Sequence, residues 1–203
     1  MMPRTAIQTA AAQDRSAAAG GARHLARQGG IAIAATAFVA LCAHISIPLG
    51  FTPVPITLQP FAVVLLGLLL APGLSFAALC LYLLEGASGL PVFSPHGLGG
   101  IAQLFGPTGG YLLAAPFAAA VAGLIYRDGK RKLLFALAGA AVGDIILLAI
   151  GAMWLGMMVN TSFSVLLNES VVPFLASDAA KVIAAAACAQ TFVSFSRRSS
   201  QPE

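Results

Sequence analysis

Two charged residues stand inside an apolar stretch near the C-terminus, and their chemistry suits binding of a polar ligand. Lys181 and Asp178 are three residues apart, so a helix places both on one face. Lysine supplies N–H donors and a positive charge for a carboxylate, whereas aspartate supplies acceptors for an N–H group. We interpret the pair as part of a binding site. The alternative is a self-neutralising pair that only eases insertion into a membrane.

A further acid, Asp144, follows Gly143 in another apolar stretch and has no cation near it in sequence. Three interpretations stay open: Asp144 caps a break in a helix, pairs with Lys181 or lines a cavity. A membrane-embedded enzyme that uses Asp144 and Asp178 is the competing functional hypothesis. The sequence offers no catalytic nucleophile, metal-ligand set or carboxylate pair at a useful spacing, so we predict no catalytic residue, no metal and no cofactor.

Composition identifies the medium in which these groups lie. Of 203 residues, 59% are hydrophobic and 9% are charged, against roughly 25% charged residues in soluble domains. So little charge excludes a disordered chain, which needs low hydrophobicity and high charge. The net charge of +4 is small and lies mostly outside the apolar stretches, which argues against nucleic-acid binding. The apolar stretches run without alternation, so the sequence predicts membrane-spanning helices rather than barrel strands.

We predict an all-α fold, a six-helix transmembrane bundle. Residues 1–30 are expected to be a disordered basic cytoplasmic tail, residues 31–196 the six-helix transmembrane substrate-binding domain, and residues 197–203 a cytoplasmic tail. The second and third segments are shorter than the ~20 residues of a straight span. The expected apolar segments are 31–49, 57–71, 72–85, 109–126, 133–158 and 173–195.

The distribution of lysine and arginine predicts the orientation. Ten of the eleven lysine and arginine residues lie in the N-terminal tail, in the turn at 127–132 or in the C-terminal tail, and the eleventh is Lys181. Six spans place these three regions on one side, and positive charge marks the cytoplasmic side. Both termini are therefore expected in the cytoplasm of a bacterium, with the protein in its inner membrane. The Gly- and Pro-rich connection 86–108 then lies outside, where binding residues tend to occur.

Small residues recur every fourth position in the first apolar segment, at Ala32, Thr36 and Ala40. Such a stripe lets another helix approach closely. We predict that it docks a partner protein, although a chain so rich in alanine also produces such stripes by chance.

Four short motifs carry a resemblance to a known family. They are Thr52–Gln59, Gly89–Phe93, Gly106–Leu112, and Pro173–Leu175 followed by Asp178 and Lys181. In this order and spacing, over about residues 31–195, the chain resembles the BioY family, the substrate-binding membrane subunits of energy-coupling-factor biotin transporters. It departs from the common family pattern at Ser94-Pro95-His96, where Gly and Asn are frequent.

The resemblance implies six helices, outward loops over a biotin pocket, and an energising module made of a transmembrane partner and two ATPase subunits. Asp178 and Lys181 match the Asp and Lys with which the family contacts biotin. Trp154 is a further candidate, as part of an apolar wall of the pocket. The remaining candidates match family motif positions and are Tyr111, Gln59, Thr57 and Phe93.

The predicted function is therefore binding of biotin from the outside and its uptake across the inner membrane, without chemistry on the ligand. The loop 86–108 and the loop after the first helix are expected to close over the ligand. Expected contacts are biotin, the energising module and membrane lipid, but no nucleic acid. The alternative within this class is a binding subunit for another small vitamin or organic solute.

Overall fold

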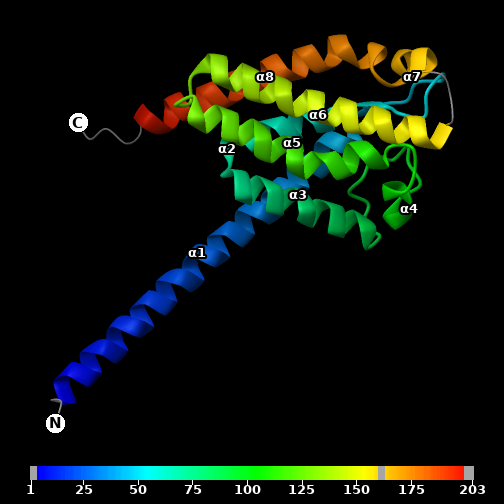
Figure 1. The fold of residues 1–203 in the computed structure, drawn as a ribbon. Helices are drawn as coiled ribbons and strands as arrows, with labels where there is room; N and C mark the ends of the chain where they lie inside the picture. Colours follow the sequence, from blue (N-terminus) through cyan, green and yellow to red (C-terminus); the bar gives the residue numbers. More distant parts are fainter. Residues whose placement is uncertain (1–3, 160–162, 199–203) are drawn as a thin grey trace.

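Long helices lie side by side and are joined by a tight turn at one end and by longer loops at the other (Figure 1). The computed structural model describes residues 4–159 and 163–198, with side chains for 20–159 and 164–195. The elements in chain order are α1 (Arg4–His44), β1 (Ser46–Ile47), β2 (Ile56–Thr57), α2 (Gln59–Leu69), α3 (Pro72–Ala87), α4 (Gly100–Leu104), α5 (Gly109–Asp128), α6 (Leu133–Val159), α7 (Phe163–Ser170) and α8 (Val172–Arg198).

Proline sets where several of these helices begin. Pro60 and Pro72 occupy the first turns of α2 and α3, where the missing N–H group costs no hydrogen bond. Pro173 lies in the first turn of α8. The helices therefore begin close to the positions predicted from the sequence. The small β1–β2 pair, with Ser46 opposite Thr57, was not predicted.

Four of the described helical stretches are long and apolar enough to cross a membrane: 20–44 in α1, α5, α6 and 164–195. The helices α2 and α3 are apolar but shorter. Large apolar side chains such as Ile145, Met153 and Phe192 are exposed, as expected where the surrounding medium is lipid. The protein is thus a mostly helical membrane protein.

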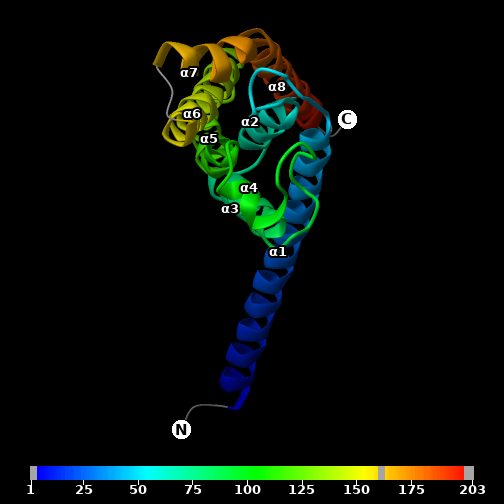
Figure 2. The ribbon, with the colours of Figure 1, turned by 90° about the vertical axis from the view of Figure 1, so that its right-hand side faces the viewer.

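The short helix α2 lies in the middle of the bundle. It contacts α1, α3, α5, α6 and α8, and a view along the bundle shows it surrounded by these helices (Figure 2). Residues 62–68 of α2 are buried without interruption. At ~1.5 Å per residue, the eleven residues of α2 span ~16 Å, which is about half the thickness of a bilayer core. The helix α2 is therefore an internal element, and the loops at its ends cover the remaining depth.

Glycine and alanine allow the central helices to pack closely. A Cβ atom at Gly67 of α2 would collide with the Ala119 carbonyl oxygen of α5, and one at Gly139 of α6 would lie 2.6 Å from the Ala122 carbonyl oxygen. The hydrophobic effect does not drive helices together in lipid, because lipid tails are as apolar as the side chains. Van der Waals contact between closely packed backbones stabilises the helix pairs instead.

The N-terminal part of α1 differs from expectation. Residues 4–30 continue α1 as one helix, where the sequence predicted a disordered tail. Alanine, glutamine and arginine are frequent there and are good helix formers, although few of them can bury apolar surface. The helix leaves the bundle and projects away from it (Figure 1). The predicted C-terminal tail lies outside the described residues from 199 onward.

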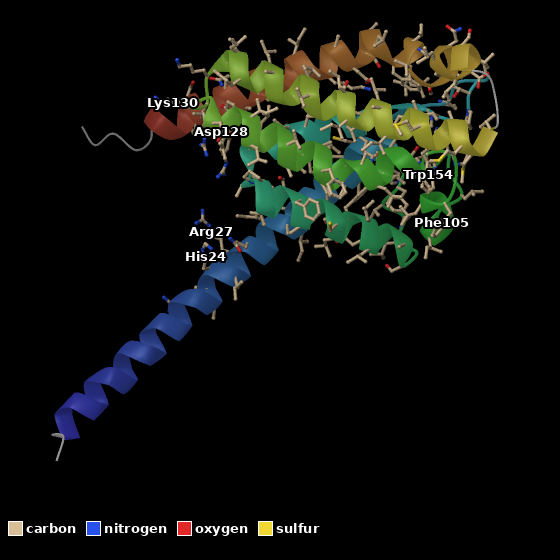
Figure 3. The ribbon with its side chains drawn as sticks, in the orientation of Figure 1. His24, Arg27, Phe105, Asp128, Lys130 and Trp154 are labelled. Atoms are coloured by element: carbon tan, nitrogen blue, oxygen red, sulfur yellow. The ribbon has the colours of Figure 1, made fainter. Side chains whose placement is uncertain are left out.

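The basic residues gather toward one end of the bundle. Asp128 and Lys130 mark the turn between α5 and α6, opposite Phe105 and Trp154 at the other end, while Arg27 of α1 lies on the Lys130 side (Figure 3). The side chains of this turn are exposed. The loops that precede α2 and α5 lie at the opposite end from this charge.

Candidate binding pocket

A pocket opens among the loops and helices at the end of the bundle away from the basic turn. Its walls come from the loop before α2, the first residues of α2, the segment 94–103, α5, α6 and α8. The lining residues are Val54, Pro55, Thr57, Gln59, Pro60, Val63, Ser94, His96, Gly97, Gln103, Thr108, Tyr111, Leu112, Ala115, Leu147, Leu148, Phe174, Asp178 and Lys181. Apolar and polar side chains both line the pocket, and the polar ones come from separate elements.

The α8 wall contributes a buried ion pair. The Lys181 Nζ atom lies 2.7 Å from Asp178 Oδ1, and the two residues are only 8% and 3% exposed. One helical turn holds the pair because the residues are three apart. Charges removed from water are tolerated when they pair and are hydrogen-bonded, and this pair meets both conditions.

Ser177 completes this polar cluster. Its Oγ atom lies 3.3 Å from Asp178 Oδ1 and 3.5 Å from Lys181 Nζ, and it is 2.9 Å from the Phe174 carbonyl oxygen. Both recorded contacts of the Asp178 carboxylate therefore use Oδ1. Among the described residues no partner is recorded for Oδ2, which leaves an acceptor in a pocket-lining side chain.

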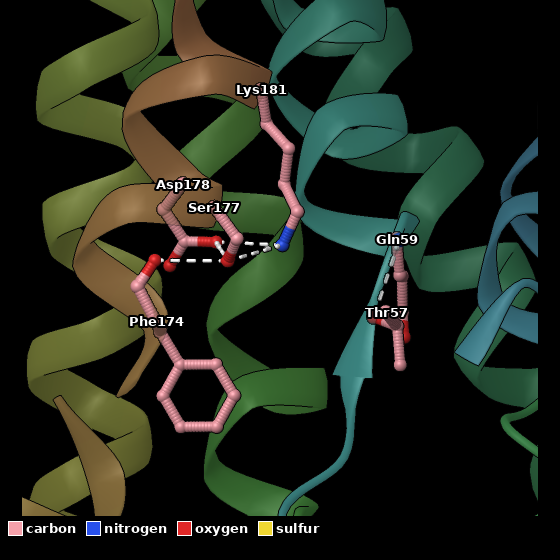
Figure 4. A network of polar contacts seen from close by, with 6 residues as sticks. All are labelled: Thr57, Gln59, Phe174, Ser177, Asp178 and Lys181. Atoms are coloured by element: carbon pink, nitrogen blue, oxygen red, sulfur yellow. Dashed lines mark hydrogen bonds and ion pairs between the residues drawn. The ribbon is translucent and has the colours of Figure 1, made fainter. Parts of the chain in front are cut away.

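The start of α2 faces this cluster across the pocket. Figure 4 shows Lys181 reaching from α8 toward Thr57 and Gln59. The Gln59 backbone N–H donates to Thr57 Oγ1 at 3.3 Å, and β1–β2 pairing fixes Thr57 beside the end of α1. The half-buried Gln59 side chain thus offers an amide to the pocket from a fixed helix start.

Tyr111 forms part of the α5 wall. Its hydroxyl donates to the Ser170 carbonyl oxygen at 3.1 Å, and its ring packs against Gly151 of α6, where a Cβ atom would collide with it. Tyr111 therefore lines the pocket with its ring while its hydroxyl ties α5 to the end of α7.

Phe93 and Trp154, which were predicted to contact the ligand, do not line the pocket. Phe93 is buried edge-on against Tyr82, with ring centroids 5.3 Å apart. The Trp154 Nε1–H group donates to the Gly106 carbonyl oxygen at 2.9 Å. Both aromatic residues contact segments that surround the pocket.

The small-residue stripe of α1 packs inside the chain. Ala32 and Thr36 are buried, and Ala40 is half-buried against the core. Thr36 Oγ1 also donates to Glu85 Oε1 of α3 at 3.1 Å. Small side chains here allow α1 to approach α3, and docking of a partner protein by this stripe stays a prediction.

Asp144 is buried on α6 and does not line the pocket. It interacts electrostatically with Asp178 and Lys181. Of the interpretations left open, the structure supports neither a direct ion pair with Lys181 nor a place in the cavity wall.

Sequence reasoning missed several lining residues. Gln103 is 2% exposed and accepts a hydrogen bond from the Gly99 N–H at 3.2 Å. Ser94 and His96 come from the segment that departs from the family pattern. A lone glutamine within the apolar run 100–105 was the available signal, because a buried amide requires partners.

Comparisons with known proteins agree with one another. A model of the BioY family matches residues 13–198. The probable biotin transporter BioY of Pyrococcus horikoshii is 42% identical over 156 residues, which cover 75% of this chain and 90% of that protein. The biotin transporter BioY of Thermotoga maritima is 39% identical over 151 residues, covering 74% and 86%.

A solved structure extends the similarity to the fold. The S-component for biotin from an ECF-type ABC transporter superposes with a TM-score of 0.77 at 27% identity, covering 85% of this chain and 93% of that chain. The similarity therefore spans the helices that form the pocket.

Proposed function

Because the chain belongs to the BioY family, we propose that it binds biotin at the outer face of the bacterial inner membrane and mediates its uptake. Its relatives are named as transporters, and its family is one of transport subunits rather than enzymes. On this proposal the ligand enters and leaves the pocket unchanged.

The buried Lys181–Asp178 pair in the wall of the pocket is the observation that carries the proposal. Biotin combines a carboxylate, a ureido ring with two N–H donors and one acceptor oxygen, and an apolar thioether ring. A pocket for such a molecule needs apolar walls and a few polar groups in fixed positions. Asp178 Oδ2, the remaining N–H of Lys181 and the Gln59 amide supply such groups.

The proposed ligand contacts are therefore Asp178, Lys181, Gln59, Thr57 and Tyr111. The Lys181 ammonium has one N–H group beyond those directed at Asp178 and Ser177, and this group can serve either the carboxylate or the ureido oxygen. Support for this set is that all five residues line one pocket although they come from three separate parts of the chain.

We further propose six membrane spans, with α2 and α3 as the two short ones, and both termini in the cytoplasm. Residues 31–196 form the substrate-binding domain, with residues 1–30 and 197–203 on the cytoplasmic side. Support comes from the enclosure of α2 by other helices and from the basic turn at 127–132, which lies at the end opposite the pocket.

The energy for uptake comes from other subunits in this proposal. The chain has no Gly-x-x-x-x-Gly-Lys-Ser/Thr pattern for binding nucleotide phosphates. The solved relative is described as a component of an ECF-type ABC transporter. A transmembrane partner and two ATPase subunits are the expected energising module, and membrane lipid surrounds the spans.

The test is uptake of radiolabelled biotin by a biotin-requiring host, with and without a co-expressed energising module. We expect uptake that depends on this chain and label that is recovered as biotin. Unlabelled vitamins of other classes serve as competitors. Absence of biotin uptake in both hosts contradicts transport of biotin, whereas uptake of another radiolabelled vitamin in place of biotin supports the alternative substrate.

A further inference from the structure

Ser94 carries a hydroxyl that is buried without a hydrogen-bond partner. Within the part of the chain whose side chains are described, two buried side-chain polar atoms lack a partner, Ser46 Oγ and Ser94 Oγ. Ser94 is 9% exposed, and it alone of the two lines the pocket. A buried hydroxyl without a partner is destabilising, so its retention in a pocket wall points to a partner that arrives with the ligand.

The residues before Ser94 are anchored to α3. The Tyr82 hydroxyl donates to the Val92 carbonyl oxygen at 2.9 Å, and the Phe93 ring packs edge-on against Tyr82. Phe93 also fills the space beside Gly86, where a Cβ atom would collide with its ring. These contacts fix the backbone immediately ahead of the serine.

The residues after Ser94 are anchored to α4. The Gly97 N–H donates to the Ser94 carbonyl oxygen at 3.2 Å and closes a turn. Gly97 packs directly on the Gln103 side-chain amide, which leaves no room for a Cβ atom. Gln103 Oε1 in turn accepts the Gly99 N–H, and Gly99 has φ +71°, a conformation that favours glycine.

The backbone that carries Ser94 is thus held in place from both sides before any ligand binds. Preorganised groups lose little entropy on binding. Across the pocket, the Asp178 carboxylate can only accept hydrogen bonds, and the Lys181 ammonium already directs N–H groups at Asp178 and Ser177. The Ser94 hydroxyl therefore adds a donor for ligand oxygen atoms on the side of the pocket opposite Lys181.

We propose that the Ser94 hydroxyl donates a hydrogen bond to an acceptor oxygen of the bound ligand and so contributes to its selection. This inference rests on the proposed function, which makes the ligand biotin. Biotin offers two such acceptors, the ureido oxygen and the carboxylate. Gln103 is a positioning residue in this proposal, because it acts on the ligand only through the segment that carries Ser94.

The test compares Ser94→Ala with Ser46→Ala in the purified full-length protein. Ser46→Ala removes the other buried, unpartnered hydroxyl and does not alter the pocket wall, so it is a matched control. We expect Ser94→Ala to raise the Kd for biotin about 2- to 10-fold by calorimetry. The Ser46→Ala variant should keep the wild-type Kd.

The ligand-free protein provides a second readout. Loss of an unpartnered buried hydroxyl should leave the thermal unfolding temperature of Ser94→Ala unchanged or raise it, because a desolvation penalty disappears. Ser94→Cys, with a weaker donor of similar shape, should weaken binding in the same direction. Wild-type affinity in both Ser94 variants overturns the inference.

A biotin analogue with sulfur in place of the ureido oxygen distinguishes the two acceptors. If the hydroxyl meets the ureido oxygen, Ser94→Ala and wild type bind this analogue equally; if it meets the carboxylate, the difference persists. Both results support the ligand contact. A wild-type protein that binds no biotin overturns the proposed function as well, whereas normal wild-type binding with no effect of Ser94 substitution overturns this inference alone.

Discussion

At the scale of single residues, the pocket separates groups that satisfy one another from groups left for a ligand. Lys181 and Asp178 are paired at 2.7 Å, and Tyr111 donates its hydroxyl to the backbone. Asp178 Oδ2 and Ser94 Oγ have no recorded partner within the described residues. Since buried polar groups in proteins are normally satisfied, Ser94 Oγ is where a ligand hydrogen bond is expected, and Asp178 Oδ2 is a further acceptor on a side chain that lines the pocket.

The first prediction concerns the charged pair. The double change Asp178→Asn with Lys181→Met should leave the protein inserted but abolish biotin binding. A charge-assisted hydrogen bond contributes about 1.5–3 kcal/mol, which is roughly tenfold to a hundredfold in affinity. Calorimetry in detergent measures the Kd.

The matched control for that double change is Asp128→Asn with Lys130→Met, which makes the same replacements at the exposed basic turn. The single change Lys181→Arg should retain only part of the wild-type affinity for biotin. The planar guanidinium aims its donors differently from an ammonium. Near-normal affinity in the Asp178/Lys181 double variant would return the pair to a purely structural role, since buried ion pairs can often be replaced by neutral groups.

At the scale of the elements, contact between backbones decides how the helices cross. Gly67 of α2 packs on the backbone of α5 at Ala119, and Gly123 of α5 packs back on the Gly67 carbonyl oxygen. A short helix such as α2 is held by these crossings rather than by its own length. The pocket depends on them because α2 carries Gln59 at its first turn.

Gly67→Ala should therefore lower the thermal unfolding temperature of the detergent-solubilised protein. The added methyl group collides with the Ala119 backbone, and overpacking of this kind typically costs about 1–3 kcal/mol. Gly73→Ala in α3 is the matched control, because a Cβ atom there meets nothing within 4 Å. Equal unfolding temperatures for the two variants would contradict the close α2–α5 crossing.

The α1 stripe gives a second test at this scale. Ala40→Trp should lower both stability and biotin binding, because Ala40 packs against the core. Ala37→Trp, on the exposed side of the same helix, should leave binding by the isolated protein unchanged. Thermal unfolding and calorimetry measure the two effects. Normal binding with reduced uptake in Ala40→Trp would instead favour the original docking hypothesis.

At the scale of the whole molecule, charge and pocket lie at opposite ends. The basic turn 127–132 is exposed at one end, and the loops that line the pocket lie at the other. Positive charge remains on the cytoplasmic side during insertion. On the proposed orientation the pocket faces outward, which is the arrangement that an uptake protein needs.

Reporter fusions test this orientation. Fusions at residue 130 and at the C-terminus should both report the cytoplasm, and a fusion in the segment before α4, at residue 99, should report the outside. The three results together require an odd number of spans between residues 99 and 130 and an even number between residue 130 and the C-terminus. A periplasmic signal at residue 130 or at the C-terminus would contradict the six-span arrangement.

The sequence by itself determined the medium, the approximate helix boundaries and the charged pair. Low charge and unbroken apolar runs require a membrane. Pro60 and Pro72 determine helix starts because proline lacks an N–H group. The three-residue spacing of Asp178 and Lys181 requires a shared face in any helix. These features depend on local chemistry, so no knowledge of the packing was needed.

Only the tertiary structure decided which faces pack together. Phe93 and Trp154 support the pocket from behind, Ser94 and Gln103 line it, and Ala32 and Thr36 are buried against α3. In a membrane helix both the lipid face and the protein face are apolar, so hydropathy does not tell them apart. Alanine and glycine occur on every side of these helices, and the side that packs is set by contacts with residues far away in the sequence.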